Sequence, residues 1–133
     1  MNDRYLGALA LSVVVLGGCG GEENRPAKWS YISPAIIQPN CATGSCHNKA
    51  AAVAGLDLSE TDAGWKGLFN QKVSRPMGVM MPRPLVTPGN PVQSRLMNML
   101  LGVGAVLMPP DRPLAGADIE LVEKWILEGA KND

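Results

Sequence analysis

The chain has 133 residues, a length that suits one folded domain. Its 12 basic and 12 acidic side chains balance, without a basic stripe or a run of like charges, so its charge gives no indication of nucleic-acid binding or of electrostatic attraction to a membrane surface. Aromatic residues make up 5% of the chain, against 15 glycines and 11 prolines. A core with so few large side chains favours a domain that packs around a bulky apolar group.

The N-terminus has the features of an export signal. Arg4 precedes an apolar run, Leu6 to Leu16, that is too short to span a bilayer as an ordinary helix. The run ends in LGGC, which resembles the lipobox of bacterial lipoproteins, where small residues precede the cysteine that receives lipid. The resemblance implies that residues 1–18 are a signal peptide and that Cys19 is lipidated. The simpler alternative is a secretory signal with an incidental cysteine.

Lipid on Cys19 would hold the protein on a membrane almost permanently, because each buried methylene contributes about 0.8 kcal/mol. Gly20, and not an Asp, follows the cysteine, which in the lipoproteins that this segment resembles favours passage to an outer membrane. We therefore expect an exported protein, lipid-anchored in the outer membrane and facing the periplasm. Residues 19–29 would be the lipidated cysteine and a flexible polar tether, and residues 30–133 the folded domain.

Capping residues predict where the first helices of the domain begin. Ser33 and Pro34 suit the start of a first helix, which Pro39 ends early unless the helix begins sooner and bends at Pro34. Ser59 suits the N-cap of a second helix over about 60–70, which has apolar residues at helical spacing.

Two further helices follow a proline-rich segment. Residues 72–89 contain four prolines and no sustained period, which predicts an ordered loop. Asn90 as N-cap and Gly102 past the end predict a third helix, whose apolar face is Leu96, Met99 and Leu100. A final helix, with Gly129 as its C-terminal cap, has the apolar stripe Ile119, Val122, Trp125 and Ile126. No alternating stretch has the length and flanks of a strand, so we predict an all-α fold.

The stretch CATGSCHNK, residues 41–49, holds two of the three cysteines and the only histidine. In an oxidising compartment, Cys41 and Cys46 would be a disulfide or covalently occupied. Covalent haem attachment uses two thiols for thioethers and an adjacent imidazole for the iron, usually in a C-x-x-C-H motif. The spacing before His47 is two residues longer, and Gly44 can take the positive φ that accommodates the extra pair.

A single histidine means that a second axial iron ligand would be a methionine sulfur, and that one haem is the maximum. Met97 and Met99 fall within the third helix, where methionine is usually core filling. Met108 is the best placed candidate, because Pro109 and Pro110 stiffen the chain after it. The remaining candidates, in a loop flanked by prolines, are Met77, Met80 and Met81.

The segment LMPPDRPLAGADIELVEKWILEGA, residues 107–130, resembles the C-terminal part of small bacterial class I cytochromes c. GLDLS and PGNPVQSRL are similar to segments of the cytochrome-c-like domains of exported lipoproteins. The resemblance covers about residues 30–130 and implies a small class I cytochrome c-like fold, with short helices around one covalently bound haem c. It implies haem thioethers at Cys41 and Cys46, the proximal iron ligand at His47 and the distal one at Met108.

One feature of that family is missing from the chain. The Gly-Pro that usually follows the haem motif, and supplies a carbonyl to the proximal imidazole, is absent. A carbonyl from about Gly55 to Leu58 is therefore expected to orient His47.

Three other interpretations of the Cys/His stretch stay open. A disulfide between Cys41 and Cys46 would staple a haem-free lipoprotein that acts as a binding or structural module. Soft Cu(I) suits the cysteines, His47 and loop methionines, although no cupredoxin-like or thioredoxin-like strand pattern is present. Structural zinc would need an acidic fourth ligand, since Cys19 is assigned to lipid.

The sequence thus predicts one-electron transfer by a membrane-anchored monohaem c-type cytochrome. Its partners would be redox proteins and, through the lipid on Cys19, the membrane, but not nucleic acid. With the only histidine assigned to the iron, no Ser/His/Asp or paired-carboxylate arrangement is available, so we do not expect an enzyme.

Overall fold

The computed structural model describes residues 24–70, 72–74, 80–82 and 84–133, and in the two three-residue pieces it describes the backbone alone. The signal peptide, Cys19 and Met77 lie outside these residues. The elements, in chain order, are α1 (Trp29–Ile32), the π-helix η1 (Ser33–Ile37), α2 (Gln38–Cys41), the 3-10 helix η2 (Val53–Gly55), α3 (Thr61–Asn70), β1 (Lys72–Ser74), β2 (Met80–Pro82), α4 (Arg95–Leu101) and α5 (Gly116–Leu127).

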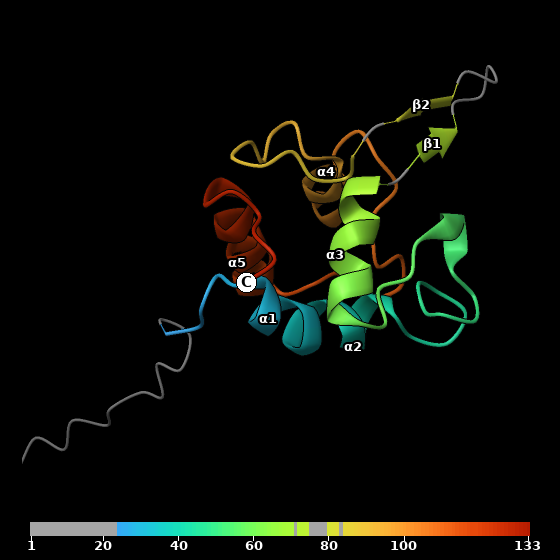
Figure 1. Cartoon of the computed structure of the whole chain (residues 1–133), viewed down its shortest axis with the longest axis horizontal. Helices are drawn as coiled ribbons and strands as arrows, with labels where there is room; N and C mark the ends of the chain where they lie inside the picture. Colours follow the sequence, from blue (N-terminus) through green and yellow to red (C-terminus); the bar gives the residue numbers. More distant parts are fainter. Residues whose placement is uncertain (1–23, 71, 75–79, 83) are drawn as a thin grey trace, which may run out of the picture.

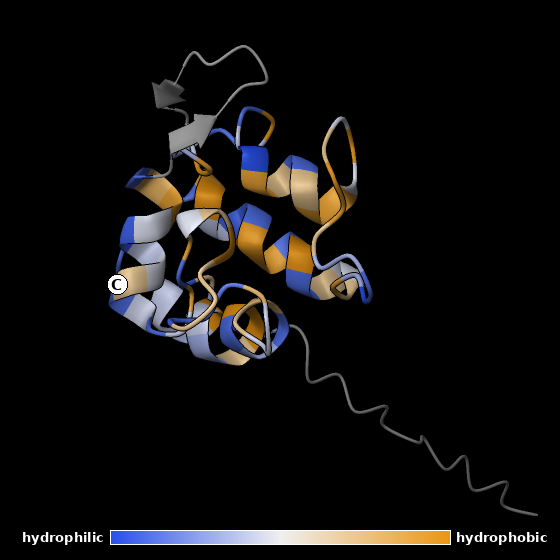
Figure 2. Ribbon diagram, turned by 90° about the vertical axis from the view of Figure 1, so that its right-hand side faces the viewer, coloured by the Kyte–Doolittle hydropathy of each residue, from blue (hydrophilic) through white to orange (hydrophobic). Residues whose placement is uncertain are grey.

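The fold is all-α in class, as predicted. Helices and the loops between them form the body in Figure 1, while β1 and β2 lie beyond the end of α3. The helices in Figure 2 carry hydrophobic and hydrophilic residues in alternation along their ribbons, as amphipathic helices do.

The first helical stretch runs without interruption from Trp29 to Cys41, through α1, η1 and α2. Of the two alternatives, an early stop at Pro39 was wrong, and a helix that begins sooner was confirmed, since α1 starts at Trp29. The π-helical turn Ser33–Ile37 lies just before Pro39. A proline inside a helix requires a departure from α-helical geometry, and this turn is such a departure. Cys41 is therefore the last residue of a helix, which fixes the position of its thiol.

The prediction of Ser33 as the N-cap was wrong. Ser33 is not an N-cap but a buried residue inside the helical stretch, whose hydroxyl accepts a hydrogen bond from Gln38 Nε2 at 3.1 Å. The first amides are satisfied from the other end of the chain: the N–H of Trp29 donates to Asp133 Oδ1 at 3.1 Å and that of Ser30 to the Asp133 carbonyl at 2.9 Å. This closure joins the two ends of the described domain.

The second helix agrees with the prediction to within a residue, since α3 spans Thr61–Asn70. Ser59 lies before it but acts locally: its N–H and hydroxyl both donate to Asp57 Oδ1, at 2.9 and 2.6 Å. The two hydrogen bonds from Ser59 are the main reason that the pKa of Asp57 is lowered from its usual value. Gly64 packs against Trp29, since a Cβ there would lie 3.4 Å from the Trp29 ring, in van der Waals contact.

The segment expected to be an ordered loop, residues 72–89, contains a short hairpin. β1 and β2 pair antiparallel, with Val73 opposite Met81. Strands of three residues are too short to show an alternation of apolar and polar residues, so the sequence pattern does not predict them. The hairpin does not change the fold class.

The third helix begins later than predicted. Asn90 caps a turn, where its Oδ1 accepts from the Gln93 N–H at 3.0 Å, and α4 starts at Arg95. Gly102 ends α4 with φ +66°, as predicted. Met97 and Leu100 are its buried residues, while Leu96 and Met99 are only partly buried.

The final helix α5 confirms the predicted stripe, with Gly129 just past its end at φ +101°. Its buried residues are Leu121, Val122, Trp125 and Ile126, and Ile119 packs at the edge of the core.

Two tryptophans from opposite ends of the domain stack in the centre of the core. The rings of Trp29 and Trp125 have centroids 4.9 Å apart, and both side chains are almost fully buried. Their indole N–H groups donate to backbone carbonyls, Trp29 to Thr61 at 2.7 Å and Trp125 to Lys131 at 2.9 Å. The stack holds α1 against α5 and thereby fixes the helix that ends at Cys41.

We expect Trp125→Ala to lower the free energy of unfolding by about 3–5 kcal/mol, because it leaves a cavity beneath Trp29. Urea unfolding of the full-length chain measures the loss. Val92→Ala is the matched control, since Val92 is 85% exposed and should change stability by less than about 0.5 kcal/mol. Equal effects of the two substitutions would contradict the central role of the stack.

Candidate functional site

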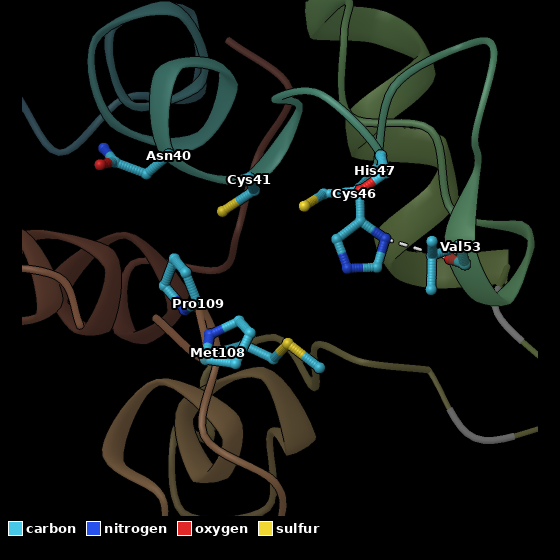
Figure 3. A pocket seen from close by; sticks show the side chains of 9 residues that line it. Asn40, Cys41, Cys46, His47, Val53, Met108 and Pro109 are labelled. Atoms are coloured by element: carbon cyan, nitrogen blue, oxygen red, sulfur yellow. Dashed lines mark hydrogen bonds between the residues drawn. The ribbon is translucent and has the colours of Figure 1, made fainter. Parts of the chain in front are cut away.

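A pocket of about 230 Å³ joins the Cys/His stretch to the loop that precedes α5 (Figure 3). The pocket is largely apolar and partly open to solvent. Its lining residues are Asn40, Cys41, Ser45, Cys46, His47, Val53, Met108, Pro109 and Pro110. Every residue that the sequence assigned to a single haem site, with Met108 as the distal ligand, therefore borders one cavity.

The loop between the two cysteines is a compact turn. The Cys46 N–H donates to the Thr43 carbonyl at 2.8 Å, and the His47 N–H donates to the Cys41 carbonyl at 3.0 Å. Gly44 takes φ +40°, the left-handed conformation that we expected it to provide. The two extra residues thus form a closed turn, and Cys41 and His47 stay joined by a backbone hydrogen bond.

His47 is oriented by a backbone carbonyl. Its Nδ1 lies 3.1 Å from the carbonyl oxygen of Val53, and since a carbonyl only accepts, Nδ1 carries the proton. In the neutral ring Nε2 then has a free lone pair, and it faces the same space as the Met108 thioether (Figure 3). The imidazole is therefore prepared to act as a ligand through Nε2.

The expected carbonyl was placed too far along the chain, between Gly55 and Leu58. Val53 supplies it because the chain reverses tightly at η2, where Ala52 and Ala54 take positive φ of 38° and 57°. Alanine does not favour that conformation, so the sequence carried no signal for the reversal.

The same reversal ties η2 to the motif through the backbone. The Val53 N–H donates to the Cys46 carbonyl at 3.2 Å, and the Leu58 N–H donates to the His47 carbonyl at 2.7 Å. The loop that contains Val53 is thus hydrogen-bonded to the backbone of both Cys46 and His47.

Cys41 and Cys46 are free thiols in the structure, and both side chains lie at the edge of the pocket, where the Cys41 sulfur points away from Cys46 (Figure 3). Burial, with a smaller contribution from Cys46, raises the pKa of the Cys41 thiol from 9.0 to about 11. Cys41 is therefore protonated at neutral pH.

Metal sites made of cysteine, histidine and carboxylate ligands find no support. Among the residues that the structure describes, no three His, Cys, Asp or Glu side chains gather as a metal ion would require. The acidic fourth ligand that structural zinc would need is not among the residues that line the pocket.

Met108 reaches the pocket from a loop anchored on α4. Its N–H donates to the Met99 carbonyl at 2.9 Å, its peptide bond to Pro109 is cis, and its side chain is half-buried. The thioether lies across the pocket from the two cysteines (Figure 3). Met97, in contrast, is only 4% exposed within the core.

Two other methionine candidates, Met80 and Met81, have their backbone in β2. Their side chains lie outside the described part of the structure. Met99 is partly buried against the core, and it contacts Met108 through its carbonyl.

Comparisons with protein-family models, with curated proteins and with solved structures give no match to this chain. In the described residues, no helix combines the length and the apolar character needed to cross a membrane.

We expect Cys41 in the reduced, cofactor-free chain to react slowly with iodoacetamide at neutral pH. Because the thiolate is the nucleophile and the pKa is about 11, the rate should keep rising up to about pH 11. Tandem mass spectrometry separates alkylation at Cys41 from that at Cys46. In urea the rate should level off near pH 9, and identical folded and unfolded profiles would contradict the burial of this thiol.

Proposed function

We propose that the protein is a membrane-anchored monohaem c-type cytochrome that transfers single electrons. The observation that carries the proposal is the convergence of two thiols, one imidazole and one thioether on a single apolar pocket. These are the groups that c-type haem attachment and His/Met axial ligation require.

The residues present fit a haem by the chemistry of their donor set. Cys41 and Cys46 would form the thioethers, and His47 would bind the iron through Nε2, which the Val53 carbonyl leaves without a proton. Met108 would be the distal ligand from the opposite loop. When bound, the haem supplies an iron that cycles between two oxidation states.

The pocket walls add two properties that suit electron transfer. Their apolar character and a thioether ligand both favour a higher potential than a bis-histidine site has. The partly open side of the pocket would leave an edge of the group within reach of a redox partner.

The proposal assigns no catalysis to this site. With His47 and Met108 both on the iron, no coordination position remains for a substrate. Since His47 is the only histidine of the chain, no second imidazole is available as a general base.

The membrane attachment is part of the proposal and depends on lipid at Cys19. Within residues 19–29, the part before Ala27 would connect the lipid to the domain, because Ala27 and Trp29 pack in the core of the described structure. Redox proteins of the periplasm or outer membrane are the expected partners.

The first test is the absorption spectrum of the chain with Cys19→Ser, produced in a periplasm with haem-attachment machinery. Dithionite should produce sharp α and β bands, and the intact mass should increase by one haem, because the two thiols take up one porphyrin. A colourless protein that is lighter than its reduced form by a pair of hydrogen atoms would instead establish a Cys41–Cys46 disulfide and the haem-free binding module.

Met108→Ala should abolish the sulfur-to-iron absorption of the oxidised protein and lower its reduction potential, because the distal thioether is lost. Met99→Ala is the matched control, since Met99 is a nearby methionine whose side chain does not line the pocket. If Met108→Ala leaves this absorption unchanged while Met80→Ala or Met81→Ala removes it, the distal ligand belongs to β2.

A further inference from the structure

Asn48, the residue directly after His47, connects the two loops on either side of the imidazole. Its side-chain amide donates from Nδ2 to the carbonyl of Gly44, in the turn between the cysteines. Its Oδ1 accepts the N–H groups of Ala50 and Ala51, each at 2.9 Å. The Asn48 side chain thus stabilises both the turn between the two cysteines and the start of the loop that leads to Val53.

The backbone of Asn48 continues the same connection. Its carbonyl accepts the N–H of Ala52 at 2.7 Å, immediately before the Val53 carbonyl that receives the His47 ring. Residues 50 to 52 are therefore wrapped around Asn48 by hydrogen bonds. This wrapping holds Ala52 in its left-handed conformation, which costs free energy in a residue other than glycine.

We propose that Asn48 is a positioning residue for the His47 imidazole. By fixing the loop over residues 50–53, it places the Val53 carbonyl where it selects the Nδ1–H tautomer and turns Nε2 toward the pocket. The consequence for iron binding by His47 rests on the proposed function. The effect on the imidazole tautomer does not require haem.

Asn is suited to this place because both halves of its amide are used. An aspartate would keep the acceptor for Ala50 and Ala51 but would lose the donor to Gly44. An alanine would lose both contacts. The two substitutions therefore separate the loop that orients His47 from the turn between the cysteines.

The test uses the ring nitrogens of His47 in the full-length, cofactor-free chain. His47 is the only histidine, so nitrogen-15 NMR of the imidazole gives one pair of signals without assignment. Measured above the pH at which the ring loses its proton, the ratio of the Nδ1–H to the Nε2–H tautomer reports the contact with the Val53 carbonyl. Circular dichroism confirms that each variant keeps its helices.

We expect Asn48→Ala to lower this tautomer ratio about fivefold, the effect of losing one net hydrogen bond. Asn48→Asp should preserve the ratio and increase amide exchange only between the cysteines. Asn40→Ala is the matched control, because Asn40 also lines the pocket and donates to a backbone carbonyl, that of Ile36 at 2.7 Å. It should leave the ratio unchanged.

The proposal is overturned if Asn48→Ala keeps its helices and the parent ratio, or if Asn40→Ala lowers the ratio equally. If Asn48→Ala does not fold, Asn48→Asp provides the test. A lower ratio of the Nδ1–H to the Nε2–H tautomer in Asn48→Asp would contradict the role of Oδ1 as the acceptor for Ala50 and Ala51. Failure of haem attachment in the parent chain would remove the proposed function but leave the tautomer result intact.

Discussion

The stack of Trp29 on Trp125 is the contact on which the rest of the domain depends. A chain with few aromatic residues places its two largest fully buried side chains face to face, one from the first helix and one from the last. Because the helical stretch from Trp29 ends at Cys41, the same contact determines where the first pocket thiol lies. Asp133 reinforces it by capping the first amides of α1.

The pocket brings together side chains from two separate parts of the chain. Cys41, Cys46 and His47 come from one short stretch, and Met108 comes from a loop anchored on α4. Residues 43–45 of the short stretch are exposed, and the turn that they form is held by hydrogen bonds of the backbone and of the Asn48 side chain. The loop over residues 48–55 thus brings the Val53 carbonyl to Nδ1 of His47.

The extent to which the sequence predicted the structure varies with the kind of signal. Periodic apolar residues located α3 and α5 to within a residue or two, because a buried helix face repeats over several turns. Single capping residues were less informative: Ser33, Ser59 and Asn90 each make a local hydrogen bond without starting a helix. Pro39 misled the prediction because a π-helical turn precedes it within the same helical stretch, and capping residues give no signal for such a turn.

The sequence by itself determined which reactive groups the chain has, since two thiols, one imidazole and a methionine before two prolines are present whatever the fold. It also determined the all-α class, through the period of its apolar residues. Only the tertiary structure decided that Met108 meets the motif in one pocket and that Val53 orients His47. Both depend on loops whose conformations are held by hydrogen bonds between neighbouring turns. In one of these loops Ala52 and Ala54 are left-handed, which no local preference predicts.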